Sequence, residues 1–207
     1  MSYTNGLDNP ELYFQTKLHS GTGGGGGSLT FDGSENMQAD MVWSKSRTEA
    51  LNHTLFDSVR TAGSNKELTP NGTSPEGGAD SAGFGYISAF NSNGFTWTAG
   101  STNTENFNKS SQTYVHWNWK ELAGAFDIVS YTGNATSGAT ISHNLGVVPQ
   151  LMFVKCRSDS TNFIVYNSAS GNTHWMYLNS TNAASANSAA WNDTSPTASV
   201  FSLGNDG

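Results

Sequence analysis

Apolar and polar residues alternate over short stretches of this chain, which is the period of β-strands rather than of helices. The clearest case is Thr113–Trp119 (TYVHWNW). Alternation there places Trp117 and Trp119 on one face and His116 and Asn118 on the other. We expect the tryptophan face to be buried, because most aromatic residues at alternating strand positions belong to a core.

Further runs of this kind are rich in aromatic and β-branched residues and are bounded by Gly, Asn, Ser and Pro. They predict strands over Leu12–Leu18, Ala39–Ser46, His53–Val59, Gly85–Phe90, Gly94–Thr98, Phe126–Tyr131, Leu151–Cys156, Asn162–Tyr166, Trp175–Asn179 and Ser199–Leu203. Short strands joined by polar loops, without a helical period, are typical of antiparallel β-sandwiches and jelly rolls. The sequence therefore predicts an all-β fold with helix confined to a turn or two.

The chain also contains an internal repeat. Four pairs of segments or positions match in the same order: Phe14–Gly21 with Phe126–Gly133, Met41–Arg47 (MVWSKSR) with Leu151–Arg157 (LMFVKCR), Asn52, Phe56 and Ser58 with Asn162, Tyr166 and Ser168, and Gly94–Trp97 with Val200–Leu203. The offset is 112 residues for the first pair and 110 for the next two. This order predicts an extended N-terminal segment (residues 1–11) and two tandem sandwich repeats of jelly-roll or lectin-like type (residues 12–122 and 123–207).

The second repeat is incomplete. It ends at Gly207, shortly after the counterpart of Gly94–Trp97, and so lacks a counterpart of Thr113–Trp119. A sandwich without this strand has an open sheet edge, which natural proteins avoid exposing. We therefore expect an open edge or a foreign strand at this place. Either the natural protein continues past Gly207, the interpretation we favour, or another chain supplies the strand.

Composition narrows the choice of partners. Only 12% of the residues are charged, about half the ~25% typical of soluble domains. A net charge of −7 argues against nucleic acid, because phosphate binding needs a basic surface. No apolar run approaches the ~18 residues of a membrane span, and Cys156, the single cysteine, cannot form an internal disulfide. We expect no nucleic-acid partner, no membrane insertion and no cofactor.

Four segments carry a resemblance to a known class of proteins: Tyr3–Asp8 (YTNGLD), Thr113–Lys120 (TYVHWNWK), Phe126–Gly133 (FDIVSYTG) and His143–Pro149 (HNLGVVP). They resemble repeat-bearing, tail-fibre-like structural proteins of tailed bacteriophages that infect marine bacteria. The resemblance implies a virion component, assembled in the host cytoplasm and exposed on the particle surface. It implies no catalytic residues.

Two basic pairs recur at matching positions. Lys45 and Arg47 in the first repeat correspond to Lys155 and Arg157 in the second. Residues two apart on a strand share a face, so each pair presents a small basic surface. One interpretation is contact with an anionic sugar or a partner protein. The interpretation that we favour is a structural ion pair with a neighbouring strand.

Tryptophans are candidates for stacking on sugar rings, whose apolar faces suit aromatic surfaces. Trp191 lies in the polar loop Ala190–Pro196 and is the best candidate for an exposed ring. The simpler interpretation, that the ring belongs to the core, is favoured for all five candidates: Trp97, Trp117, Trp119, Trp175 and Trp191 itself.

Signs of catalysis are weak. The five histidines lack the close spacings of metal sites, and no two carboxylates are recognisable as an acid/base pair. Gly23–Gly27 lacks the Lys-Ser/Thr that follows a phosphate loop, so a flexible hairpin connection is the better interpretation. We expect a protein that is not an enzyme and has no metal site.

Three functional hypotheses follow. The leading one is a non-enzymatic structural or adhesive virion protein (a tail fibre, an appendage or a decoration of the capsid surface). Such proteins assemble symmetrically with copies of themselves, in fibres often as trimers, and with other virion proteins. The alternative is a carbohydrate-binding module that recognises a host surface glycan. An enzyme acting on surface polysaccharide would need paired carboxylates in a groove.

Overall fold

The computed structural model describes residues 9–205 of the chain. The motif Tyr3–Asp8 and the last two residues lie outside this range, as does most of the extended segment expected over residues 1–11. The described end of that segment is a turn of 3-10 helix, η1 (Pro10–Leu12), which the Asn9 side chain caps.

The chain is an all-β protein with several antiparallel sheets, and about 6% of its residues are in helix and 32% in strands. Within residues 9–205, the remaining helix consists of two single turns, α1 (Ser81–Phe84) and α2 (Ser188–Trp191). The expected all-β class with antiparallel strands is therefore confirmed.

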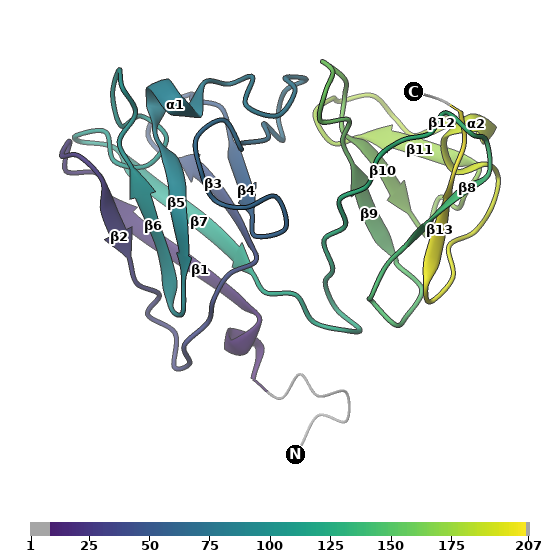
Figure 1. The fold of residues 1–207 in the computed structure, drawn as a ribbon, viewed down its shortest axis with the longest axis horizontal. Helices are drawn as coiled ribbons and strands as arrows, with labels where there is room; N and C mark the ends of the chain where they lie inside the picture. The colour runs from purple at the N-terminus through teal and green to yellow at the C-terminus, as the bar shows by residue number, and fades with distance from the viewer. Residues whose placement is uncertain (1–8, 206–207) are drawn as a thin grey trace. The chain divides into compact units, whose positions relative to one another are not determined.

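The chain forms two compact units. Unit one runs as far as Thr69 and continues over Ser74–Glu121, and unit two contains Pro70–Thr73 and the chain from Leu122 onward. Each unit has its own sheets, labelled in Figure 1.

Unit one contains a four-stranded and a three-stranded antiparallel sheet (Figure 1). The larger sheet has the order β1 (Phe14–Ser20), β7 (Thr113–Trp119), β3 (Met41–Ser46), β4 (Thr54–Asp57). The smaller has the order β2 (Gly27–Leu29), β6 (Gly94–Thr98), β5 (Tyr86–Asn91). Both sheets contribute to one buried core: Leu29, Phe31, Met37, Ala39, Val42, Phe56, Ile87, Phe95, Trp97 and Phe107.

The central strand β7 turns the opposite face inward from the one expected. Its inward side chains Tyr114, His116 and Asn118 are fully buried, whereas Trp117 and Trp119 are partly exposed on the other face. The expectation of a buried tryptophan face is therefore wrong. The physical reason is that the inward polar groups find hydrogen-bond partners inside the unit; the Asn118 amide, for example, donates to two main-chain carbonyls.

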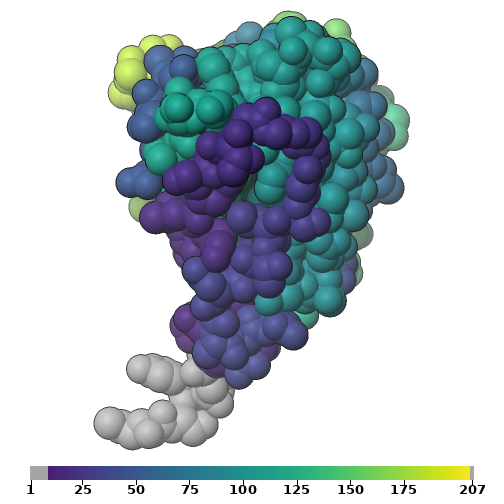
Figure 2. Space-filling view, turned by 90° about the vertical axis from the view of Figure 1, so that its left-hand side faces the viewer, coloured from purple at the N-terminus to yellow at the C-terminus, as the bar shows by residue number. Residues whose placement is uncertain are grey.

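The glycine-rich segment Gly23–Gly27 connects β1 to β2 and so passes from one sheet to the other, which corrects the expected hairpin. It lies on the surface of unit one (dark purple in Figure 2). The Gly23 amide donates to the carbonyl of Asn108. A Cβ at Gly27 would lie 2.6 Å from the Trp97 ring, so the close approach to β6 requires glycine there.

Unit two contains a four-stranded antiparallel sheet of order β12 (Ser185–Ala186), β11 (His174–Tyr177), β10 (Ile164–Asn167), β9 (Leu151–Val154). A separate pair joins β8 (Ala139–Ser142) to β13 (Val200–Leu203). The strand expected over Phe126–Tyr131 is absent, because residues 127–131 pair with no strand among the described residues.

The strand pairs of the two units share their registers. The β3–β4 and β9–β10 hairpins pair residues whose numbers differ by the same 110: Met41 with Asp57 and Leu151 with Asn167, Val42 with Phe56 and Met152 with Tyr166, Trp43 with Leu55 and Phe153 with Val165, Ser44 with Thr54 and Val154 with Ile164. The β2–β6 and β8–β13 pairs also correspond, with an offset of 112 residues between β2 and β8 and of 106 between β6 and β13: Gly27 with Trp97 and Ala139 with Leu203, Ser28 with Thr96 and Thr140 with Ser202, Leu29 with Phe95 and Ile141 with Phe201.

The units differ at one edge. In unit one, β3 pairs with β4 on one side and with β7 on the other. Its counterpart β9 pairs with β10 alone, and no strand within residues 9–205 covers its other side. Unit two therefore has an unpaired edge where unit one has its central strand.

Candidate binding surface

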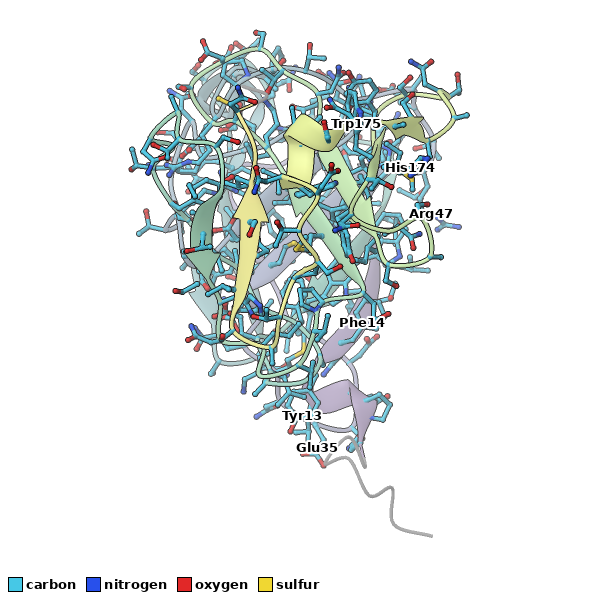
Figure 3. The ribbon with its side chains drawn as sticks, turned by 90° about the vertical axis from the view of Figure 1, so that its right-hand side faces the viewer. Tyr13, Phe14, Glu35, Arg47, His174 and Trp175 are labelled. Atoms are coloured by element: carbon cyan, nitrogen blue, oxygen red, sulfur yellow. The ribbon has the colours of Figure 1, made fainter. Side chains whose placement is uncertain are left out.

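The outward face of the larger sheet of unit one carries a group of aromatic side chains, which we call the aromatic face: Phe14 on β1, Trp117 and Trp119 on β7, and Trp43 on β3. Phe14 lies at the start of β1 (Figure 3) and is 39% exposed. The three tryptophans are partly exposed. Large apolar groups gathered on an outer sheet face mark an interaction surface more often than scattered ones do.

Strand register brings these rings together in two neighbouring rows. One row contains Phe14 opposite Trp119, with ring centroids 5.1 Å apart. The next contains Trp117 opposite Trp43, in an edge-to-face contact at 6.3 Å and 81°. Cross-strand aromatic pairs stabilise a sheet, so the rings are held in fixed positions before any partner arrives.

A histidine at the edge of the aromatic face fixes one of its rings. The Trp43 Nε1 donates a hydrogen bond of 2.8 Å to His53 Nδ1. Burial, together with the positive charge of Lys45, lowers the pKa of His53. His53 therefore stays neutral at neutral pH and keeps the lone pair that accepts the indole proton.

The aromatic face can bind by apolar contact and stacking. Leu18, 52% exposed, continues it along β1. Such a surface suits the C–H faces of sugar rings or an apolar surface of a partner protein. The sequence predicted the alternation along Thr113–Trp119 correctly. It assigned the face of Trp117 and Trp119 to the core, whereas this face lies on the outside.

A chain of hydrogen-bonding groups lies on the inward face of the same sheet. Ser44 Oγ is 2.7 Å from His116 Nδ1, and His116 Nε2 is 2.9 Å from His19 Nδ1. Serine beside histidine is also the arrangement of a nucleophile and its base. However, Ser44 is 1% exposed and His116 is fully buried, so no substrate can reach them. These hydrogen bonds link the strands β1, β7 and β3 instead.

Burial lowers the pKa of His116 well below its usual range, with a smaller contribution from His19, and burial also lowers the pKa of His19. An unfolded histidine takes up its proton near pH ~6.5. The stabilisation by neutral His116 is therefore complete above that pH and is lost as the pH falls from ~6.5 toward the lowered folded-state pKa. We expect the free energy of unfolding to decline there by up to about 1.4 kcal/mol per pH unit for this residue.

Urea unfolding between pH 8 and pH 5 measures this decline, and NMR of the histidine ring protons assigns it. The His116 ring should not titrate near pH ~6.5 while the protein remains folded. A His116 titration near pH ~6.5 in the folded protein would contradict the assignment.

The two recurring lysines contact their own loops. Lys45 Nζ donates to the carbonyls of Ser46 and Glu49, at 2.5 and 2.9 Å. Lys155 Nζ donates at the corresponding positions of unit two, to the carbonyls of Cys156 and Asp159, at 2.7 and 3.0 Å. Each lysine thus closes the turn after its strand, a structural role of a different kind from the expected ion pair with a neighbouring strand.

The recurring arginines differ from each other. Arg47 is exposed just after the end of β3 (Figure 3), and its main-chain amide donates to the carbonyl of Thr113. Arg157 is also exposed, and its Nη1 donates to Ser130 Oγ at 2.9 Å. The lysines turn toward their loops, so each unit presents an arginine rather than a basic pair.

Trp191 is not an exposed platform. It is 2% exposed, its Nε1 donates to the carbonyl of His174, and its ring meets Tyr166 edge to face at 5.7 Å. This burial corrects the choice of Trp191 as the candidate for an exposed ring: the start of the expected loop belongs to α2, and the indole is turned inward. Trp97 is buried, as expected of a core residue, and Trp175, labelled in Figure 3, is partly exposed on β11.

Sequence reasoning missed a buried ion pair. Arg60 Nη2 lies 2.6 Å from Asp57 Oδ2, and both side chains are at least 95% buried. Nearby Glu67, fully buried, accepts hydrogen bonds from the amides of Ala79 and Ser81. The available signal was a pair of opposite charges three residues apart.

No group of three or more His, Cys, Asp or Glu within residues 9–205 has the geometry to hold a metal ion. In the same range there is no helix of the length and apolar character required to cross a membrane.

Comparison with known proteins gives one match. Residues 9–207 match the model of a family described as a domain of unknown function, DUF7483. No curated protein and no solved structure matches the chain. Because the matched region covers nearly the whole sequence, the chain belongs to the DUF7483 family.

Proposed function

We propose that the chain is a non-enzymatic structural and adhesive protein of a virus particle, such as a tail fibre, an appendage or a decoration of the capsid surface. The observation that carries the proposal is the aromatic face of unit one. It gives a β-protein with few charges a preformed surface for attachment, to a host or to another component of the particle.

The proposed architecture is two tandem copies of one antiparallel sandwich. Its support is the shared register of β3–β4 with β9–β10 and of β2–β6 with β8–β13. A side-chain contact recurs as well: Ser58 Oγ donates to Asp40 Oδ1, and Ser168 Oγ to Gln150 Oε1. Arrays of such units suit an extended particle protein, in which each copy adds length and surface.

The burial of the groups that most resemble catalytic ones supports a non-enzymatic role. The serine–histidine chain around His116 is sealed inside unit one, and the carboxylates of Asp57 and Glu67 are buried and engaged by neighbouring groups. The virion context rests on the resemblance of Thr113–Lys120 and Phe126–Gly133 to tail-fibre-like proteins. It makes other copies of the chain, as a trimer, and other virion proteins the proposed partners.

A second candidate function is recognition of a host surface glycan. It is favoured by the fixed orientation of Trp43 and Trp117, whose rings meet edge to face on an outward sheet surface. A fibre can carry such a site, so the two functions are compatible.

Replacing Trp117 by alanine should weaken attachment at least about tenfold, because a central aromatic residue commonly contributes more than 1.4 kcal/mol to an interface. Binding of the purified chain to a glycan array and to intact host cells measures the effect. Trp175→Ala, which removes a partly exposed tryptophan of unit two, is the matched control and should bind as the unaltered chain does.

The same experiment separates the partners. Loss of binding on the array supports the glycan, whereas loss on cells alone points to a protein receptor. Unchanged binding of a folded Trp117→Ala variant to both would rule out the aromatic face as the adhesive surface.

A further inference from the structure

We infer that the ligand of the aromatic face is an acidic oligosaccharide, whose carboxylate or sulfate group is bound by Arg47. The inference rests on the proposed attachment through this face, and it names the chemistry that the face selects. The tryptophans carry the sugar rings, and Arg47 determines which sugars are accepted.

Arg47 lies at one end of the aromatic face, on the same side of the sheet. It follows Trp43 by four residues, and residues two apart along a strand share a face. Its amide donates to the carbonyl of Thr113, so the pairing of β3 with β7 continues as far as Arg47. Phe14, opposite Trp119, lies at the other end of the face; Phe14 and Arg47 are both labelled in Figure 3.

The guanidinium of Arg47 is available to a ligand. Arg47 is exposed, and no carboxylate of residues 9–205 forms an ion pair with it. Glu49, two residues further on, is engaged by Lys109 at 2.8 Å and by the Gln112 amide at 3.0 Å. A guanidinium binds a planar oxyanion through two parallel hydrogen bonds, so an acidic group is the partner that suits Arg47.

Lys45 adds a second positive charge at this end of the face. It lies between Trp43 and Arg47 on the same side of β3, and its ammonium donates to two main-chain carbonyls. Carbonyls carry no net charge, so the ammonium is not neutralised. Charges more than about 8 Å away are largely screened at physiological ionic strength. A ligand at this end therefore meets positive charge, although the whole chain carries −7.

The outward side of β1 favours a sugar over an apolar protein surface. Its apolar side chains, Phe14 and Leu18, alternate with the hydroxyl groups of Thr16 and Ser20, and all four residues are exposed. Thr16 lies opposite Trp117, within the aromatic rows. A sugar offers apolar C–H faces to the rings and hydroxyls to Thr16 and Ser20. An apolar partner surface would leave these two hydroxyls without hydrogen bonds.

The length of the face requires more than one sugar. Four residues along a strand span about 13 Å, at ~3.3 Å per residue, and this separates Trp43 from Arg47. The distance exceeds the width of a single sugar ring. Stacking and the contact to the acidic group are therefore made by different sugars of one oligosaccharide, and a monosaccharide cannot make both.

Unit two repeats part of this arrangement. Phe153, which corresponds to Trp43, is 46% exposed, and the exposed Arg157 follows it by four residues. Between them, Lys155 closes its turn in the same way as Lys45. Both units thus combine an outward aromatic ring with an arginine at the same spacing. Unit one has in addition the two tryptophans of β7, so the principal site lies there.

Binding of the purified full chain to paired oligosaccharides tests the inference. Oligogalacturonates supply carboxylates, and keratan sulfate fragments supply sulfates; each is compared with its carboxyl-reduced or desulfated counterpart. At least one acidic series should bind about tenfold more tightly than its neutral counterpart, because hydrogen bonds to charged groups are the stronger ones. The series that shows the preference identifies the acidic group, and added salt should reduce the preference.

Three variants separate the roles of the residues. Arg47→Gln should weaken binding of the acidic oligosaccharide about tenfold and leave its neutral counterpart unchanged, because it removes the charge and keeps a polar side chain. Trp117→Ala should weaken both. Lys17→Gln removes the same charge from a lysine that pairs with Asp32 and should change neither.

Four results would each overturn the inference: equal binding of acidic and neutral members in both series, an acidic preference that survives Arg47→Gln, an equal loss in Lys17→Gln, or no binding of any acidic oligosaccharide. The attachment of Trp117→Ala to host cells is measured separately. If that variant loses attachment while no acidic preference is found, the adhesive function stands and only its assignment to an acidic glycan fails.

Discussion

Replacing Trp191 by alanine should lower the stability of unit two by about 3–5 kcal/mol, the usual loss for a large buried aromatic side chain. The indole is 2% exposed, packs against Tyr166 and donates a hydrogen bond to the carbonyl of His174. Few other apolar residues of the described part of unit two are as deeply buried: Phe163, Val165, Tyr166 and Phe201. Removing the largest member of so small a core leaves a cavity that the others cannot fill.

Urea unfolding followed by near-ultraviolet circular dichroism measures the loss. Leu151→Ala is the matched control in the same unit, because Leu151 is 54% exposed and should change stability by no more than about 0.5 kcal/mol. A loss below about 1 kcal/mol for Trp191→Ala would mean that the indole faces solvent, as its polar sequence neighbourhood suggests.

Replacing Arg60 by alanine should destabilise unit one by about 3–5 kcal/mol, because it leaves the Asp57 carboxylate buried without its counter-charge. Arg60 Nε and Nη2 lie 2.7 and 2.6 Å from Asp57 Oδ2, and Arg60 Nη1 donates to the carbonyl of Lys66. The guanidinium thus ties the end of β4 to the long segment that follows it.

Two variants test the reason for this loss. The double replacement Asp57→Leu with Arg60→Met should recover part of the stability, since neither charge of this pair remains buried and Glu76, which loses its 3.8 Å contact with Arg60, keeps its ion pair with Lys66 at 3.5 Å. Lys17→Ala, which removes an ion pair to the 71%-exposed Asp32 carboxylate, should cost no more than about 1 kcal/mol. If Arg60→Ala costs no more than Lys17→Ala, the Asp57–Arg60 pair does not stabilise the fold.

The sequence predicted where the strands lie better than which way they face. Period-two alternation located β7, and the matching segments located β3 and β9, because both signals are local. The inward face of β7 depends on partners more than 70 residues away: Ser44 and His19 for His116. Apolar character alone assigned the tryptophans to the core, and these long-range hydrogen bonds reversed the assignment.

The distinction between local signals and long-range contacts also explains the other differences between the predicted and the observed structure. The run Phe126–Tyr131 has the residues of a strand, but a strand requires a paired neighbour, and its neighbour is missing from residues 9–205. Trp191 was placed in a loop because α2 is only one turn long and is capped by Asn187, a residue equally common in turns. The contacts of Lys45 and Lys155 could not be inferred, since their acceptors are main-chain carbonyls of the turn rather than charged side chains.

The most direct test of the proposed function is the location of the chain in intact particles. Virus particles purified by density gradient from lysates that contain this chain can be analysed by quantitative mass spectrometry and labelled with antibodies against unit one. The account predicts a fixed number of copies per particle and labelling of the outer surface of intact particles. A chain found only in the soluble fraction of the lysate, with none in the particles, would contradict it.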